Sequence, residues 1–199
     1  KDGNIWIGTQ SGLYFFHAAT RELSPYPIGG HDNQKYDIRS LLLDGDHLWI
    51  GTYAKGIRVV NLRTGAVKVY THSRGIPYTI CSNDVLCFYR GRNGEIYVGT
   101  SWGLCRYDAA KDNFMPIINI GSMISITDMH EDMYNHLWIA TSSSGVFTYN
   151  TINGHYKNYQ HEREDSTTIT SNSIITLFED VKGTMWFGTN GGGLCSFDA

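Results

Sequence analysis

Two histidines in matching positions are the first candidates for chemistry in this sequence. His72 and His161 each follow a tyrosine by two residues, and they lie 89 residues apart in the chain. Paired histidines that face one space are typical of a metal site or of acid–base catalysis. A structural hydrogen bond at each position is the alternative.

Other patterns that carry chemistry are absent from the sequence. It contains no HExxH, no Gly-x-Ser-x-Gly and no glycine loop that would bind phosphate. His130, Glu131 and Asp132 are consecutive, and we interpret them as a solvated turn. The four cysteines lack metal-ligand spacing, and we expect them to behave as small buried hydrophobes. They are Cys81, Cys87, Cys105 and Cys195. We therefore predict no enzymatic activity, no cofactor and no metal.

Composition restricts the partners. The 199 residues include 16 basic and 19 acidic side chains, which give a net charge of −3. This balance offers no basic surface for nucleic acid or for an anionic membrane. No apolar run approaches the roughly 18 residues of a membrane span. The sequence starts at Lys1 without an initiator methionine, and we expect it to be a fragment of a longer mature protein.

A repeated segment organises the whole chain. The first copy reads Ile-Trp-Ile-Gly-Thr, and each copy centres on an aromatic residue. Successive anchors are 43, 48, 41 and 48 residues apart, and a Gly-(Leu/Ile/Val) pair follows each one. The anchors are Trp6, Trp49, Tyr97, Trp138 and Trp186. Five copies of two linked motifs at this spacing indicate a repeat architecture.

Each repeat divides into four short strands, A to D, separated by turn residues. Strand A is apolar, as at residues 38–43, 85–89, 124–129 and 174–178. Strand B carries the aromatic anchor, strand C begins at the Gly-Leu pair, and strand D is short, as at 67–70 and 156–159. Four antiparallel strands every 40 to 50 residues predict an all-β fold made of β-propeller blades. Residues 1–199 would form three full blades between two partial end blades, as a slice of a larger propeller.

The repeat motif has first of all a structural role. Alternation along a strand places Leu48 and Ile50 on one face and Trp49 and Gly51 on the other. We expect each aromatic anchor to pack against the neighbouring blade, and each glycine to leave room for another residue's ring. The glycines of this group are Gly8, Gly51, Gly99 and Gly188, and Ala140 replaces the glycine in the fourth repeat. The threonine that ends strand B should bond to nearby backbone.

Loops on one face of the propeller are the default binding surface. Chain direction brings the B–C and D–A loops to the same side, and loops on rigid scaffolds carry function. The D–A loops span residues 28–37, 72–82 and 160–173. Trp102 replaces small residues in its loop, and its ring would either stack on a sugar or cap the disc. Polar candidates, with a solvated rim as the alternative, are Tyr53, Lys55, His72, Arg74, His161, Arg163 and Asn190.

The linked motifs resemble the two-component regulator propeller repeat. The fit is closest at residues 180–189, Asp-x-x-Gly-x-x-Trp-x-Gly-Thr, and at residues 193–198. A Tyr-x-His element followed by Ser-Asn-x-(Val/Ile) also resembles the family, at residues 70–85 and 159–174. Since Tyr-x-His looks like part of that repeat, we expect structural hydrogen bonds from His72 and His161. The third repeat departs by lacking its tryptophan.

The resemblance implies the periplasmic sensor region of a hybrid two-component regulator or sensor histidine kinase. Such a region would recognise oligosaccharides, and its partners would be further blades, downstream signalling domains and possible second copies in a homodimer. Two other functions stay open. Streptogramin lyase propellers are similar in their Gly-x-(Ile/Leu)-Trp turn, although only His72 or His161 could serve their chemistry. A scaffold that binds protein partners is the third hypothesis.

Overall fold

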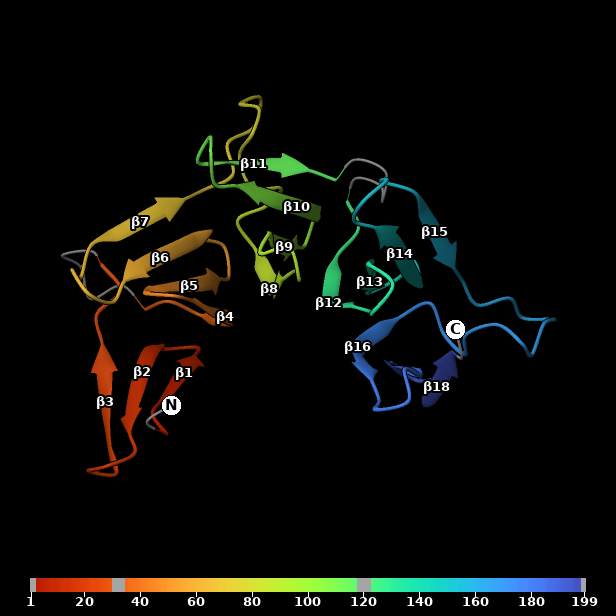
Figure 1. The fold of residues 1–199 in the computed structure, drawn as a ribbon, viewed down its shortest axis with the longest axis horizontal. Coiled ribbons are helices and arrows are strands. Elements are labelled where there is room, and N and C mark those ends of the chain that lie inside the picture. The colour runs from red at the N-terminus through yellow and green to blue at the C-terminus, as the bar shows by residue number, and fades with distance from the viewer. Residues whose placement is uncertain (1–2, 30–34, 118–122, 198–199) are drawn as a thin grey trace.

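The computed structural model describes residues 3–29, 35–117 and 123–197. They form five antiparallel sheets that follow one another along an open arc, with the strand at the inner side of each sheet facing a common centre (Figure 1). The first and last sheets have three strands, and the three between them have four. The all-β arrangement of four-stranded propeller blades is therefore confirmed. The described residues contain no helix.

Strand order in every sheet follows the chain, so each sheet is a meander. Blade 1 contains β1 (Ile5–Thr9), β2 (Gly12–His17) and β3 (Glu22–Tyr26). Blade 2 contains β4 (Ile38–Asp44), β5 (His47–Thr52), β6 (Ile57–Asn61) and β7 (Val67–Tyr70). Blade 3 contains β8 (Val85–Arg90), β9 (Ile96–Thr100), β10 (Gly103–Asp108) and β11 (Asn113–Pro116). Blade 4 contains β12 (Ile126–Glu131), β13 (His136–Thr141), β14 (Val146–Asn150) and β15 (Tyr156–Tyr159). Blade 5 contains β16 (Ile174–Glu179), β17 (Met185–Thr189) and β18 (Leu194–Phe197).

The innermost strands of blades 2 to 5 share one irregularity. In β4, β8, β12 and β16 the register with the next strand shifts by one residue, near the start of the strand. A bulge of this kind turns a side chain out of the regular alternation. In blade 2 it presents Ser40, whose Oγ accepts a hydrogen bond from the Phe88 amide of blade 3 at 3.1 Å. In blade 4 the Asp128 carboxylate accepts the Leu177 amide of blade 5 at 2.9 Å. The bulges therefore link neighbouring blades.

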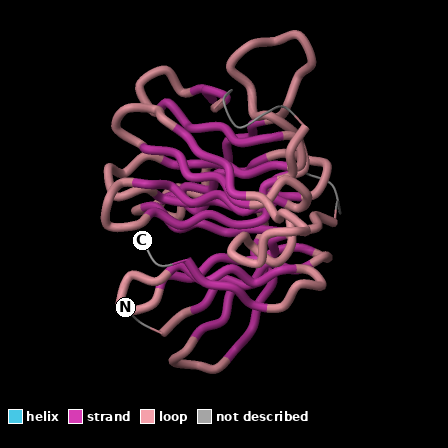
Figure 2. Tube along the Cα trace, turned by 90° about the vertical axis from the view of Figure 1, so that its right-hand side faces the viewer, coloured by secondary structure: helices cyan, strands magenta, loops and turns pink. Residues whose placement is uncertain are grey.

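The strands run across the disc, so that loops gather on its two faces (Figure 2). On one face, B–C and D–A loops meet, as where the Asp84 carboxylate accepts the Ala54 amide at 2.6 Å. On the other face, A–B and C–D turns meet, as where Asn61 bonds to His47 at 3.3 Å. This is the division of loops that the chain direction predicts.

The core lies between the blades. Trp49 is 4% exposed and packs on Val59 of its own blade and on Val98 and Tyr107 of blade 3. The adjacent residue Leu48 points the other way, into the cluster shared with blade 1. The B strand thus contributes side chains to the cores at both neighbouring junctions. This explains why such strands have apolar residues on one face and an aromatic anchor on the other.

The motif glycines provide space at the same junctions. A Cβ on Gly51 would lie 2.7 Å from Val85 Cγ1 and 3.1 Å from the Phe88 ring. At Gly8 the nearest atom is instead Ile38 Cγ2, at 2.5 Å. At Gly99 and Gly188 the nearest atoms are Cys87 Sγ, at 2.5 Å, and Thr176 Cγ2, at 2.9 Å, which belong to the innermost strand of the same blade. An aromatic ring takes part of the space only at Gly51 among the four motif glycines.

Candidate functional site

The turn from strand B to strand C has the same internal hydrogen bond in all five blades. The hydroxyl of Thr52 donates to the carbonyl of Gly56 at 2.7 Å, inside the protein. Corresponding bonds of 2.7 to 2.9 Å are made by Thr9, Thr100, Thr141 and Thr189. The prediction that these hydroxyls bond to nearby backbone is confirmed. The threonines therefore stabilise the B–C turns, which form part of the loop face.

The two matching histidines make identical structural bonds. His72 Nδ1 lies 2.8 Å from the Ile80 carbonyl, and His161 Nδ1 lies 2.8 Å from the Ile169 carbonyl. A carbonyl oxygen only accepts, so Nδ1 of each ring carries the proton. The backbone amide of each histidine also donates, at 2.7 Å, to the asparagine of the following Ser-Asn element. Both histidines therefore fasten their D–A loops, as the sequence interpretation expects.

The loop face brings part of the predicted binding set together around Asp84. One carboxylate oxygen accepts the Ala54 amide from the loop of Tyr53 and Lys55, and the other accepts Ser101 Oγ at 3.5 Å, next to Trp102. Trp102 is 56% exposed, and its ring centroid lies 6.4 Å from that of His72 in an edge-on arrangement. An exposed aromatic face is thus present where the sequence predicts it.

Of the other predicted residues on this face, Arg74 lies in the D–A loop of His72, and the rest form a second group two blades further along the arc. Asn190 is exposed, and its amide donates to the Ser173 carbonyl at 2.8 Å. His161 bonds to the same D–A loop. Arg74 and Arg163 are exposed in their D–A loops. Of the loop at 28–37, residues 30–34 lie outside the described part of the chain, as does Asp198 of the last motif.

The interpretation of residues 130–132 as a solvated turn is wrong. Glu131 and Asp132 are 2% and 4% exposed. Glu131 accepts the Arg92 amide of blade 3 at 2.7 Å, and His130 Nε2 lies 2.7 Å from the Glu179 carboxylate of blade 5. These residues therefore join three blades. Their charged types hid this role, because the sequence alone does not show that partners from two other repeats surround them.

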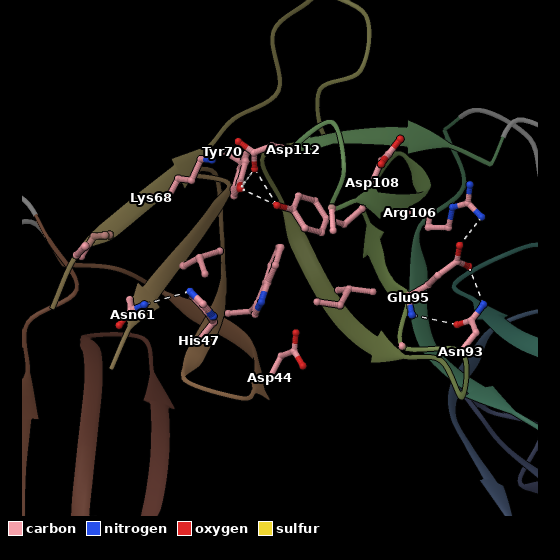
Figure 3. A pocket seen from close by; sticks show the side chains of 18 residues that line it. Asp44, His47, Asn61, Lys68, Tyr70, Asn93, Glu95, Arg106, Asp108 and Asp112 are labelled. Atoms are coloured by element: carbon pink, nitrogen blue, oxygen red, sulfur yellow. Dashed lines mark hydrogen bonds and ion pairs between the residues drawn. The ribbon is translucent and has the colours of Figure 1, made fainter. Parts of the chain in front are cut away.

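A cleft of about 750 Å³ lies on the opposite face, between blades 2 and 3 (Figure 3). Its deepest part is apolar and includes Trp49, Val59 and Ile96, all of them buried. The A–B and C–D turns supply its polar rim, which includes Asp44, His47, Asn61 and Asp108. The predicted binding residues lie on the loop face, and no sequence motif indicated this cleft.

Two tyrosines and one carboxylate form the outer wall of the cleft. Tyr70 of β7 and Tyr107 of β10 both donate to Asp112 Oδ1, and Lys68 contacts the other oxygen of that carboxylate (Figure 3). The hydrogen bonds from Lys68 and Tyr70 lower the pKa of Asp112 to about 2. Burial, together with the bond to Asp112, raises the pKa of Tyr70 well above its ordinary value. The group is therefore ionised at the carboxylate and protonated at both tyrosines at neutral pH.

Hydrogen bonds of the motif aspartate explain why it precedes the tryptophan by six residues. Asp132 accepts the amides of Tyr134 and His136 at 2.8 and 2.9 Å, and the indole of Trp138 at 2.8 Å. Asp180 makes the matching bond to Trp186 at 3.1 Å. Residues 168–191 match the family described as "Two component regulator propeller". The chain carries a two-component regulator propeller repeat.

Solved structures extend this likeness over the whole chain. The extracellular domain of the putative hybrid two component system BT3049 from B. thetaiotaomicron superposes with a TM-score of 0.80. The two are 25% identical, over 96% of this chain and 24% of that domain. Virginiamycin B lyase from Staphylococcus aureus matches with a TM-score of 0.71 at 15% identity, over 99% of this chain and 67% of the lyase. This second likeness shows the propeller fold alone.

A sequence relative is the "Histidine kinase P4" of Formosa agariphila, 35% identical over 75 residues. The matched part is 38% of this chain and 5% of the kinase. This chain thus spans 24% of the BT3049 domain, and its matched part spans 5% of the kinase. In the described residues, no cluster of three or more potential metal ligands occurs, and no helix has the length and hydropathy of a membrane span.

Proposed function

We propose that this chain is part of the extracytoplasmic, ligand-sensing propeller of a hybrid two-component regulator or sensor histidine kinase. The observation that carries the proposal is the likeness to the extracellular domain of BT3049, which covers 96% of this chain at a TM-score of 0.80. The match of residues 168–191 to the regulator propeller family and the histidine kinase relative support it independently. The location would be periplasmic, and the chain itself would perform no catalysis.

The chain would be a slice of a larger propeller. Ile5 and Ile7 on blade 1 are 52% and 37% exposed, and Phe178 and Leu194 on blade 5 are 63% and 64% exposed. Apolar side chains at corresponding positions in the inner blades are covered by a neighbour. Further blades, or a second copy in a homodimer, would cover these two faces.

The proposed ligand is an oligosaccharide, bound first of all at the loop face. The exposed ring of Trp102 offers a flat apolar surface beside His72, and Tyr53 and Lys55 lie in the adjoining loop. Sugar rings combine an apolar face with many hydroxyl groups, so an aromatic platform with a polar surround suits them.

A thermal-shift screen of the purified chain against an oligosaccharide panel tests this function. A ligand present at about 100 times its Kd stabilises the native state by about 2.7 kcal/mol and raises Tm. The expected result is a concentration-dependent rise with at least one oligosaccharide. A panel without any rise in Tm would contradict the proposed ligand class.

A further inference from the structure

The cleft between blades 2 and 3 differs from the other three junctions between blades. In each junction, an aromatic or aliphatic residue at or just after the end of strand D packs near the residue that lies four positions after the motif glycine of the next C strand. Only at this junction, among the four between described blades, do both residues carry a hydroxyl group, Tyr70 and Tyr107. The pairs at the other junctions are Tyr26 with Val60, Ile117 with Tyr149, and Tyr159 with Phe197.

The junction between blades 4 and 5 is the most similar of the other three to the junction between blades 2 and 3. There Trp138, Tyr159 and Phe197 form the same aromatic group, with Tyr159 and Phe197 centroids 5.3 Å apart. The corresponding distance between Tyr70 and Tyr107 is 6.0 Å. The propeller therefore closes a junction of this type without the second hydroxyl. Gly65 and Gly154 stand at the position of Asp112 in the C–D turns of blades 2 and 4, so other junctions form without its carboxylate. Architecture alone does not require the polar wall of this cleft.

The size and lining of the cleft suit a polyhydroxylated ligand. Its volume of about 750 Å³ lies within the range of small-molecule sites, which is roughly 300 to 1,000 Å³. The apolar floor offers contact for the carbon face of a sugar ring. Asp44 and Asp108 stand at the rim, and carboxylate oxygens accept strong hydrogen bonds from hydroxyl groups. Asn61 adds an amide.

The charge of the lining selects against acidic ligands. Four carboxylates and two fixed cations line the cleft. Two further cations pair with the rim carboxylates from outside the lining, Arg90 with Asp44 at 3.1 Å and Lys111 with Asp108 at 3.5 Å. Both cations of the lining are already engaged, since Lys68 contacts Asp112 and Arg106 Nη1 lies 2.7 Å from Glu95. A sulfate or uronate group would meet only cations that already pair with carboxylates, and it would lose hydration without gaining a cation of its own.

We propose that this cleft is a second saccharide site, specific for uncharged oligosaccharides, on the face opposite Trp102. The inference rests on the proposed function, because it gives the sensor a site and a ligand class within this chain. Tyr70, Tyr107 and Asp112 fix the wall, and the A–B and C–D turns of two different repeats supply the rim. The site exists only when blades 2 and 3 are packed together.

Calorimetric titration of the purified chain tests the site with neutral glucose, galactose and mannose tetrasaccharides and a sulfated galactose tetrasaccharide as probes. Ala66→Trp places a large ring into the cleft from an exposed position in the C–D turn. We expect it to weaken the binding of a neutral probe at least tenfold. His155→Trp places the same ring at the corresponding exposed position in the C–D turn of blade 4, away from both sites; it is the control and should change the Kd of the neutral probe by less than twofold. The sulfated probe should bind at least tenfold more weakly than its neutral counterpart.

A second variant keeps the test decisive if the tryptophan disturbs folding. Asp108 Oδ1 accepts the amides of Ala110 and Lys111, and Asn61 and Asn150 do the same at the corresponding turns. Asp108→Asn therefore preserves the turn while it removes one carboxylate. This variant should bind the neutral probe several-fold more weakly. The ratio between the Kd of the sulfated probe and the Kd of the neutral probe should also fall.

Three outcomes overturn the proposal, and they separate it from the proposed function. If Ala66→Trp and Asp108→Asn leave binding unchanged while Trp102→Ala removes it, the cleft is not a site and the sensor function stands. If the sulfated probe binds more tightly than the neutral one in the cleft, the assigned ligand class is wrong. If no probe binds, the cleft proposal fails, and the wider oligosaccharide panel decides on the function itself.

Discussion

The indole nitrogen of Trp138 donates a 2.8 Å hydrogen bond to the carboxylate of Asp132, six residues earlier and buried at the A–B turn. The same carboxylate accepts two backbone amides of that turn. Burial alone would raise the pKa of Asp132, but the bonds from His136, Trp138 and Tyr134 outweigh it and hold that pKa below its ordinary value. One side chain thus fixes both the turn and the anchor of the repeat.

Replacing this aspartate should destabilise the fold. Asp132→Asn places an amide donor against the Trp138 indole and leaves a buried N–H group without an acceptor, which costs about 1–3 kcal/mol. Chemical denaturation measures the loss. Asp180→Asn is the matched control, because Asp180 makes the same bonds at a partly exposed turn. It should cost less than Asp132→Asn, and equal costs would contradict the importance of burial.

A methyl group at Gly51 should strain the junction between blades 2 and 3. Its Cβ would lie 2.7 Å from Val85 Cγ1, in a core packed without spare volume. We expect Gly51→Ala to cost about 1–3 kcal/mol in the free energy of unfolding. In the double variant with Val85→Ala the cost should fall below the sum of the single costs. Strict additivity would show that this contact is not the source of the strain.

The threonine of the B–C turn should matter most where it is buried. Thr52→Val keeps the shape but removes the donor to the Gly56 carbonyl, at about 1 kcal/mol. Thr9→Val removes the same bond at a partly buried turn. Urea denaturation should therefore rank the Thr52 variant as the less stable, and the reverse ranking would argue against burial as the cause.

Acid should weaken the wall of the cleft. The bonds from Lys68 and Tyr70 lower the pKa of Asp112 from 3.8 to about 2. The folded pKa lies below the unfolded one, so the stabilisation is fully present above pH 4 and is lost as the pH falls towards 2. Lys68→Met removes the largest cause of the shift. Urea midpoints at pH 5, 4, 3 and 2 should show a shallower decline for this variant, and parallel declines would contradict the assignment.

The blades were predictable because the sequence of each repeat is sufficient to locate its strands. Val67–Tyr70 and Tyr156–Tyr159 coincide with the predicted D strands, and β12 begins two residues later than predicted, at Ile126. The same bulge follows the first residue of β4, β8 and β16, which begin as predicted, so Ile126 and not residue 124 is the counterpart of Ile38, Val85 and Ile174. A bulge follows from contacts with the next blade, as in the bond between Asp128 and Leu177, and period-two alternation carries no sign of it.

A candidate site was predictable only where its residues belong to a single repeat. Trp102 stands out because it differs from its counterparts in the same loop, and its side chain is 56% exposed. The cleft combines Tyr70 from one repeat with Tyr107 and Asp112 from the next. Aligning the repeats would have shown that only this junction pairs two tyrosines, and that is the signal the sequence offered.

The most direct test of the sensor function is the phosphorylation state of the kinase of which we propose this chain is a part. That kinase would be reconstituted in membrane vesicles, and phosphate incorporation from labelled ATP measured with and without an oligosaccharide that binds the chain. The account predicts a change in phosphorylation that saturates with the binding curve and is lost in a non-binding variant of the chain. Phosphorylation that stays constant at saturating oligosaccharide would contradict it.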